Sequence, residues 1–199
     1  MRINEIFYSI QGEGANSGTP AIFVRFSGCN LNCNFCDTDF KRYFDVSEED
    51  IARSMDYELY NGCKFVVFTG GEPLLQLNRK LCDLLHEKGF TIAVESNGTI
   101  ETDLPIDWLT ISPKHAFTNA KTKIKRCNEV KLLVDDNTTL EQLDATTEQI
   151  KAEKYYLQPI DDSSSKLNTM ANTNKAIWLI KDRPQWKISL QLHKILKVR

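Results

Sequence analysis

The sequence predicts an α/β fold in which about six parallel strands form an incomplete, or partial, barrel of the TIM type. Six short runs rich in apolar, β-branched and aromatic residues recur along the chain, and helical patterns lie between several of them. Such hydrophobic strands separated by helices are typical of a parallel sheet that helices cover. A complete eight-stranded barrel takes about 250 residues, whereas this chain has 199. We therefore expect one domain, residues 1–199, with a barrel that lacks strands.

The predicted strands lie at residues 21–26, 65–68, 91–94, 108–111, 130–134 and 155–157. Helices are expected at residues 47–60, 77–88 and 138–151. Ser47 with Asp50, and Thr139 with Gln142, have the spacing of helix-capping pairs. Gly89 is typical of a residue just after a helix.

Composition and charge exclude several classes of protein. The chain is 41% hydrophobic and 26% charged, which is typical of a globular protein rather than a disordered one. Its net charge of -2 disfavours nucleic acid as a partner. The basic cluster of Lys121, Lys123, Lys125 and Arg126 is interpreted as a solvated face, since no aromatic residues are interleaved with it.

Membrane insertion and secretion are also disfavoured. The longest uninterrupted apolar run is residues 176–180, and a membrane helix needs about 20 apolar residues. Glu5 stands where a secretory signal would begin its apolar stretch. We therefore expect no membrane partner and a cytoplasmic location.

Polar and glycine-rich segments follow the predicted strands rather than precede them. They are Gly28 with the cysteines after it, and residues 70–73, 95–98, 112–114 and 158–161. The C-terminal ends of parallel strands form the ligand face of α/β folds. These segments are therefore expected to converge on one site.

Three of the six cysteines, Cys29, Cys33 and Cys36, lie close together in the sequence. Thiolates at such spacing suit an iron–sulfur cluster or zinc. A structural zinc site would need a fourth ligand nearby, and no Cys or His follows Cys36 within the next twenty residues. A [4Fe–4S] cluster held by three thiolates would leave one iron open to a ligand. The alternative is a structural site completed by one of the three distant cysteines.

The spacing Cys-x-x-x-Cys-x-x-Cys over residues 29–36 resembles the signature of the radical S-adenosylmethionine (SAM) superfamily. Gly-Gly-Glu-Pro at residues 70–73 resembles the glycine-rich motif that follows the second strand in that superfamily. The resemblance implies the fold of radical SAM enzymes, with SAM bound at an open iron and cleaved reductively to methionine and a 5′-deoxyadenosyl radical.

The flanking motifs are similar to those of the 7-carboxy-7-deazaguanine synthase family. They are Gln-Gly-Glu-Gly at residues 11–14, Pro-Ala-Ile-Phe-Val-Arg at 20–25, Cys-Asp-Thr at 36–38, Ser-Pro-Lys at 112–114, Gln-Pro at 158–159 and the stretch 190–194. Glu-Ser-Asn-Gly at residues 95–98 has Ser where the family pattern has Thr, which retains the hydroxyl.

This resemblance implies a lyase reaction and its cofactors. The substrate 6-carboxy-5,6,7,8-tetrahydropterin would undergo radical ring contraction, lose ammonia and become 7-carboxy-7-deazaguanine, a precursor of 7-deazapurines such as queuosine. The implied cofactors are a [4Fe–4S] cluster on Cys29, Cys33 and Cys36, SAM, and Mg²⁺ with Thr38 as its ligand. SAM would be regenerated in each turnover.

The substrate-binding residues are predicted from the resemblance and from side-chain chemistry. Arg25 can pair bidentately with the substrate carboxylate, and Gln11 and Glu13 can meet the donor and acceptor edge of a pterin. The full set is Ile10, Gln11, Gly12, Glu13, Arg25, Thr69 and Arg199. The alternative for Arg25 is a structural ion pair within the sheet.

A second set is predicted to contact SAM from the cysteine loop and from neighbouring strand ends. Its members are Phe35, Cys36, Asp37, Gly71, Glu72, Ser112, Pro113, Lys114, Gln158, Pro159, Ile160 and Asp161. Glycine lets the backbone approach a ligand, and the Glu72 carboxylate is expected to hold an ammonium group. For the loop residues the alternative is ordinary turn chemistry. His193 is a candidate proton donor near the substrate, and no further catalytic residue is assigned.

Two other functions remain open on the sequence. A glycyl-radical activating enzyme shares the three-cysteine loop but has no use for residues 11–14 together with Arg25. A non-catalytic metal-binding module would hold a cluster or zinc without cleaving SAM. The expected partners are a small pterin, a flavodoxin-like reductant and a second copy of the chain in a homodimer, because an incomplete barrel leaves sheet edges to cover.

Overall fold

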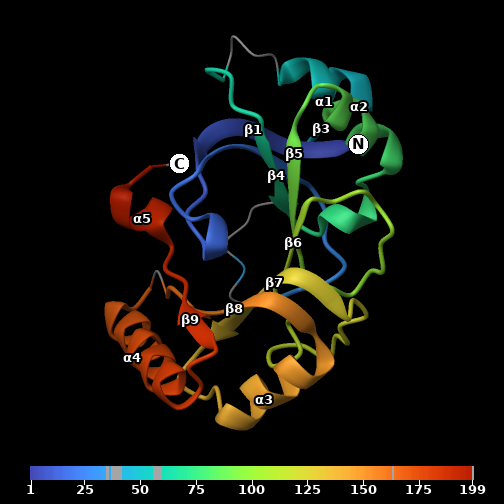
Figure 1. Cartoon of the computed structure of the whole chain (residues 1–199). Coiled ribbons are helices and arrows are strands. Elements are labelled where there is room, and N and C mark those ends of the chain that lie inside the picture. Colours follow the sequence, from blue (N-terminus) through green and yellow to red (C-terminus); the bar gives the residue numbers. More distant parts are fainter. Residues whose placement is uncertain (35, 37–41, 56–59, 163, 199) are drawn as a thin grey trace.

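A computed structural model describes residues 1–34, 36, 42–55, 60–162 and 164–198 of the chain. Within these residues one nine-stranded sheet, in the order β3-β1-β2-β4-β5-β6-β7-β8-β9, curls into a partial barrel (Figure 1). Its two outermost strands, β3 and β9, do not pair with each other in the described part of the chain. The prediction of an α/β fold with an incomplete barrel is confirmed.

All six predicted strands form, and they run parallel to one another. They are β2 (Pro20–Phe26), β4 (Phe65–Gly70), β5 (Thr91–Ser96), β6 (Trp108–Ile111), β7 (Arg126–Val134) and β8 (Lys151–Pro159). Several are longer than predicted because their polar ends continue the ladder beyond the apolar run that marks them in the sequence.

Three further strands were not predicted. β1 (Arg2–Ile10) runs antiparallel to β2, and the two-residue β3 (Phe44–Asp45) pairs with β1. The register between β1 and β2 shifts between Ile3 and Glu5, which breaks the alternation by which a strand is recognised. β9 (Trp186–Ile188) adds a third parallel neighbour to the β7–β8 pair but has only three residues.

The three predicted helices form with the expected caps but are shorter than predicted. They are α1 (Glu48–Ser54), α2 (Arg79–Glu87) and α3 (Leu140–Gln149). Ser47 caps α1 by accepting from the Asp50 amide, and Thr139 with Gln142 forms a complete capping box on α3. Residues 56–59, at the predicted end of the first helix, lie outside the described residues.

Two helices at the C-terminal side escaped prediction. α4 (Lys166–Asp182) lies along β8 and β9, and α5 (Leu192–Leu196) follows β9 (Figure 1). The polar Asn172 faces the core from α4, whereas Leu167 and Met170 are exposed, so the helix lacks a clear apolar stripe. Two single-turn 3-10 helices, η1 (Gly14–Asn16) and η2 (Pro73–Leu75), complete the elements.

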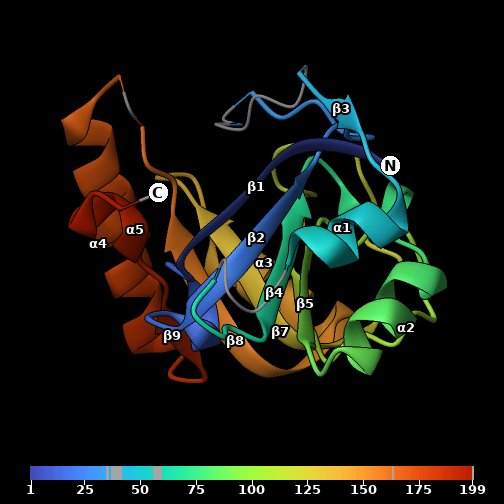
Figure 2. The same ribbon diagram turned by 90° about the horizontal axis from the view of Figure 1, so that it is seen from above.

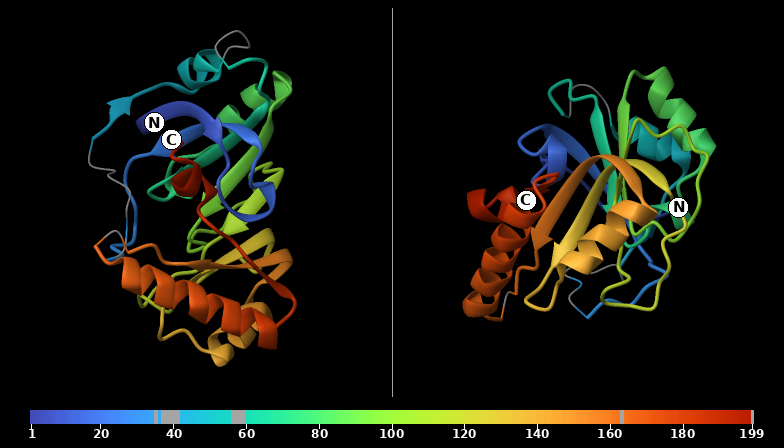
Figure 3. Two further views of the ribbon diagram at one scale, coloured as in Figure 1. Left: turned by 90° about the vertical axis from the view of Figure 1, so that its left-hand side faces the viewer. Right: turned by 60° about the horizontal axis from the view of Figure 1, so that its bottom comes forward.

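Alternate side chains of each strand face opposite sides of the sheet. On β2, Ile22 and Val24 belong to the large core under the helices, whereas Ala21 and Phe23 belong to a small cluster on the other face. The helices cover the outer face, as the views from above and from the side show (Figures 2 and 3). The inner face therefore has an apolar floor, and its remaining positions are available for polar side chains.

None of the helices in the described ranges has the length and apolar character that a bilayer crossing requires. The four side chains of the basic cluster are exposed, and they alternate with the buried Thr122 and Ile124 just before and at the start of β7.

The helix-covered core should carry much of the stability. Leu81 of α2 is fully buried, whereas Leu75 of η2 is 49% exposed. We expect Leu81→Ala to lower the free energy of unfolding by about 2–5 kcal/mol, because it leaves a cavity. The matched control Leu75→Ala should cost under about 0.5 kcal/mol. Urea denaturation of both variants measures the two changes, and equal losses would contradict this assignment of the core.

Candidate functional site

A cavity of about 490 Å³ opens at the C-terminal ends of the parallel strands. It is lined by inner-face residues of the strands and by the loops that follow them, as the position of the polar segments in the sequence predicts. Arg25 of β2 and Thr69 of β4 are register partners on neighbouring strands, and both line the cavity. The strand ends therefore bring residues from most of the chain together at one site.

Most of the predicted site residues line this cavity. They are Ile10, Gln11, Gly12, Glu13, Arg25, Cys29, Cys33, Cys36, Thr69, Gly71, Ser112, Lys114, Gln158, Pro159, Ile160 and Asp161, together with the candidate His193. Phe35, Asp37, Thr38 and Arg199 lie outside the described residues. Pro113 is buried and is not part of the cavity wall.

Glu72 differs from its expected place, because its carboxylate is turned into the protein. The side chain is fully buried and accepts hydrogen bonds from the Leu74 amide at 3.0 Å, the Asn97 amide at 2.8 Å and the Ser96 hydroxyl at 2.9 Å. Burial raises the pKa of Glu72 even though these donors oppose the shift. The expectation that this side chain holds a ligand ammonium is corrected: it anchors the loop after β5.

The three clustered cysteines all line one part of the cavity. Burial raises the pKa of the Cys29 and Cys33 thiols, and neighbouring thiols add to the rise. In the described part of the chain, no three His, Cys, Asp or Glu side chains converge as a single metal ion requires. A [4Fe–4S] cluster would take one thiolate from each of the three cysteines, each on a different iron. Binding it would release the thiol protons.

Two glycines set the position of the cysteine loop. A Cβ on Gly71 would lie 1.9 Å from the Gly28 carbonyl oxygen, and a Cβ on Gly70 would lie 2.3 Å from that of Phe26. Gly70 also has a φ of +109°, which favours glycine. The end of β4 can therefore touch the segment that leads into Cys29, and the Glu72 amide donates to the Gly28 carbonyl at 3.0 Å.

Arg25 contacts a carboxylate within the sheet while it lines the cavity. Its Nε donates to Glu5 Oε1 at 2.8 Å, and its guanidinium lies 5.8 Å from the centre of the Phe7 ring. The contact with Glu5 therefore supports the alternative interpretation of Arg25 as a structural ion-pair partner. A guanidinium held by its Nε keeps a direction, and this fixed fork suits a ligand carboxylate.

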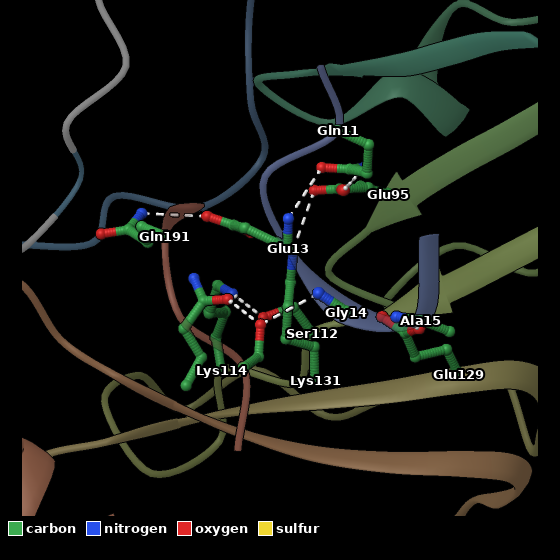
Figure 4. Close-up of polar contacts among 12 residues, drawn as sticks. Gln11, Glu13, Gly14, Ala15, Glu95, Ser112, Lys114, Glu129, Lys131 and Gln191 are labelled. Carbon is green, nitrogen blue, oxygen red and sulfur yellow. Dashed lines mark hydrogen bonds and ion pairs between the residues drawn. The ribbon is translucent and has the colours of Figure 1, made fainter. Parts of the chain in front are cut away.

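A largely buried charge cluster forms one wall of the cavity, from the segment after β1, from β5 and from β7 (Figure 4). Lys131 donates to Glu13 and, at 3.1 Å, to Glu95 Oε2. Gln11 donates to Glu95 at 2.9 Å, and Gln191 donates to Glu13 at 2.9 Å. Burial alone would raise the pKa of Glu13, but Lys131 and these hydrogen bonds lower it to about 2. The wall therefore presents ionised carboxylate on a framework of donors.

Hydrogen bonds join the loop that carries Gly12 and Glu13 to β7 and to the residue that follows β9. The Ala15 amide donates to Glu129 Oε2 at 2.7 Å, and the Gly14 amide donates to the Ser189 hydroxyl at 3.0 Å. Ser189 in turn donates to Gln158 at 3.0 Å. Burial raises the pKa of Glu129 to about 7.

A second lysine, which is partly buried, lies beside the cysteines. Lys114 donates to the Ser112 hydroxyl at 2.5 Å, and Cys33 is close enough to affect its charge. Burial, together with the nearby Lys131, lowers the pKa of Lys114 to about 8. The ammonium at the end of β6 is therefore available to an anionic ligand group near the thiols.

Sequence reasoning assigned no role to Glu95, Glu129, Lys131 and Gln191, of which Glu129 does not line the cavity but accepts from the Ala15 amide. A signal existed for the first three, since each is a charged residue within a predicted strand or at its end, and buried charges are kept where they are paired or used. Gln191 gave no such signal, because its role depends on a contact with Glu13 across 178 positions of the chain.

Glu129 should make stability depend on pH. Its pKa of about 7 lies above the ordinary value of 4.5, so the folded chain binds its proton more tightly than the unfolded chain. The stability that this proton contributes is complete below about pH 4.5 and is lost as the pH rises through about 7.

We therefore expect the unfolding free energy of the natural chain to fall by about 3 kcal/mol relative to Glu129→Gln over this interval. Urea titrations at several pH values measure it. Glu148→Gln, an exposed change on α3, is the matched control. Parallel pH curves for the natural chain and Glu129→Gln would contradict the expected pKa.

Comparisons with known proteins identify the relatives of this chain. Residues 23–132 match the family model described as the radical SAM superfamily. A 7-carboxy-7-deazaguanine synthase of Bacteroides thetaiotaomicron is 39% identical over 199 residues, covering 100% of this chain and 98% of the relative. One of Burkholderia multivorans is 38% identical, covering 98% of each chain.

Solved structures agree with these relatives. The crystal structure of QueE from Escherichia coli superposes with a TM-score of 0.80 at 31% identity, covering 96% of this chain and 94% of that one. SuiB of Streptococcus suis, at 14% identity and a TM-score of 0.57, shares the fold alone. The chain thus belongs to the radical SAM superfamily and, within it, to the 7-carboxy-7-deazaguanine synthase family.

Proposed function

We propose that this enzyme converts 6-carboxy-5,6,7,8-tetrahydropterin into 7-carboxy-7-deazaguanine and ammonia, for the biosynthesis of 7-deazapurines such as queuosine. The observation that carries the proposal is one cavity with the three cysteines, the guanidinium of Arg25, and a carboxylate wall around Glu13. A glycyl-radical activating enzyme or a metal-binding module has no need for the last two. The family to which the chain belongs favours the same choice.

Membership in the radical SAM superfamily implies a [4Fe–4S] cluster and SAM as cofactors. When bound, they supply a 5′-deoxyadenosyl radical that starts the ring contraction. Cys29, Cys33 and Cys36 would hold the cluster, while Gly71, Ser112, Lys114 and the segment 158–161 would hold SAM. Thr38 is proposed to bind Mg²⁺ together with oxygen atoms of the substrate.

Arg25 and the carboxylate wall would orient the substrate from its two ends. Arg25 would bind the substrate carboxylate, beside Thr69 on the neighbouring strand. Glu13 would accept hydrogen bonds from N–H groups at the amino-pyrimidinone edge of the pterin, and the Gln11 amide would offer both a donor and an acceptor there. Held between Arg25 and the carboxylate wall, the pterin ring would have one orientation, with one of its faces toward the cysteine side of the cavity.

Reconstitution of the whole reaction tests the proposal. The protein is loaded anaerobically with iron and sulfide and given dithionite, SAM, Mg²⁺ and the carboxypterin. The product is expected to be the carboxylated deazaguanine, lighter than the substrate by one ammonia, without stoichiometric loss of SAM. If 5′-deoxyadenosine accumulates and no deazapurine forms, the substrate assignment is wrong. If an intact cluster cleaves no SAM, the radical reaction is wrong as well.

Arg25→Met should raise KM for the carboxypterin ~30-fold or more, because the substrate carboxylate then loses its charged partner in a shielded site. Arg25→Lys should give an intermediate value, since an ammonium cannot bind a carboxylate bidentately. Glu5→Gln is the matched control: it removes the ion pair but leaves the guanidinium. If Glu5→Gln raises KM as much as Arg25→Met, Arg25 acts through the ion pair alone.

A homodimer and a flavodoxin-like reductant complete the proposal. Apolar side chains are exposed on α4 and beyond β9, and they are Leu167, Met170, Ile177, Trp178, Leu190, Ile195 and Leu196. Burying them against a second copy would remove apolar surface from water. We expect Trp178→Glu to shift the sedimenting species from dimer to monomer, and a natural chain that sediments as a monomer would contradict the dimer.

A further inference from the structure

The charge cluster contains one ammonium that contacts two carboxylates at once. Lys131 lies on the inner face of β7, with 5% of its side chain exposed, and reaches across the cavity wall to Glu13 after β1 and Glu95 on β5. Its two partners come from the segment after β1 and from β5, which are not neighbouring strands of the sheet (Figure 4). A buried ammonium is costly unless it is paired, so its presence calls for a function.

We propose that Lys131 is a positioning residue for the substrate: it fixes Glu13 and Glu95 as a pair of carboxylates that accept hydrogen bonds from the N–H and NH2 groups of a ligand ring. The proposal rests on the proposed function and deepens it. Lys131 acts through the two carboxylates, which are the groups that face the ligand.

The hydrogen bonds leave both carboxylates with spare acceptor capacity. Each carboxylate can accept about four hydrogen bonds. Among the described residues, Glu13 accepts from Lys131 and Gln191, and Glu95 accepts from Lys131 and Gln11. All four of these contacts hold the carboxylates in place, and the remaining lone pairs are available to donors in the cavity.

The charges of the wall also select the ligand. Two carboxylates share one ammonium, so Glu13, Glu95 and Lys131 together carry one net negative charge. Glu129, on the same face of β7, has a pKa of about 7 and adds part of a further negative charge near neutral pH, while the Lys114 ammonium interacts with Glu13 and Glu95 from the side of the cysteines. Such a wall attracts ring donors and repels a carboxylate, which directs the acidic end of the substrate toward Arg25.

Removal of Lys131 should therefore weaken binding rather than the chemical step. Lys131→Met leaves Glu13 buried without its ammonium, and burial then favours the protonated carboxyl. We expect KM for the carboxypterin to rise ~30-fold or more near neutral pH, with a much smaller change in kcat. Lys131→Arg should recover much of the loss because it keeps the charge.

The pH profile distinguishes positioning from general damage. In the natural enzyme Glu13 stays ionised across the assay range, so its titration leaves kcat/KM unaffected. In Lys131→Met, kcat/KM relative to the natural enzyme should rise with pH as Glu13 ionises, whereas the other charged groups around Glu13, which are Glu95, Lys114, Glu129 and His193, are present in both chains. Lys154→Met, an exposed lysine on β8, is the matched control and should follow the natural profile.

A double-mutant cycle with Glu13→Gln provides a second test, because it measures the coupling between Lys131 and Glu13 separately from a general loss of stability. In the Glu13→Gln background no charge is left at Glu13, so Lys131→Met should add far less than it does in the natural chain. Additive effects on KM would contradict the proposal, because they would show that Lys131 acts independently of Glu13.

Three possible results would contradict different parts of this account: the proposed function, the positioning role of Lys131, or its action on the substrate rather than the cofactor. If the natural enzyme cleaves SAM but leaves the carboxypterin unchanged, the proposed function and the positioning role both fail. If it converts the pterin and Lys131→Met keeps its KM and its pH profile, the positioning role alone is wrong. If Lys131→Met loses 5′-deoxyadenosine formation even without pterin, Lys131 supports the cofactor rather than the substrate.

Discussion

The two-residue period of the parallel strands is the constraint on which the rest of this structure depends. It gives every strand one face for the helices and one face for the barrel interior. The outer face is filled by a large apolar core, whereas the inner face has only a small apolar floor. Above that floor the same alternation places charged side chains on the inner face, where they contact one another. Buried charges are tolerated when they are paired in this way. The charge cluster and the fold are thus products of one pattern.

Close contact between backbones provides the second requirement of the site. The glycines at the end of β4 let that strand touch the start of the cysteine loop. Glu72 then holds the end of β5 and the loop after it, because its carboxylate accepts from the Ser96 hydroxyl and the Asn97 amide. The Gly-Gly-Glu motif therefore acts largely on the protein itself. It places the thiols and the neighbouring loops before any cofactor binds, which lowers the cost of ordering them on binding.

Much of the fold and most of the cavity lining could be predicted from the sequence, because both follow from local patterns. Each of the six apolar runs became a strand, and the capping pairs at Ser47 and Thr139 marked the helices they begin. β1 and α4 could not be predicted in this way: a register shift interrupts the first, and the second has no clear apolar stripe. The wall around Lys131 was missed because its contacts join distant parts of the chain, and the true position of Glu72 depends on the donors that surround it.

The hydrogen bonds between residues 12–14 and residues 189–192 have a consequence for synthesis of the chain. Gly14 is held by Ser189, Glu13 by Gln191, and the Leu192 amide donates to the Gly12 carbonyl at 2.9 Å. Chains emerge from the ribosome N-terminus first, and contacts between distant residues are slow to form. A nascent chain that ends at β8 therefore contains the β7 partners of this loop, Glu129 and Lys131, but still lacks Ser189, Gln191 and Leu192. The loop that carries Glu13 obtains its last contacts only when the C-terminal residues have been made.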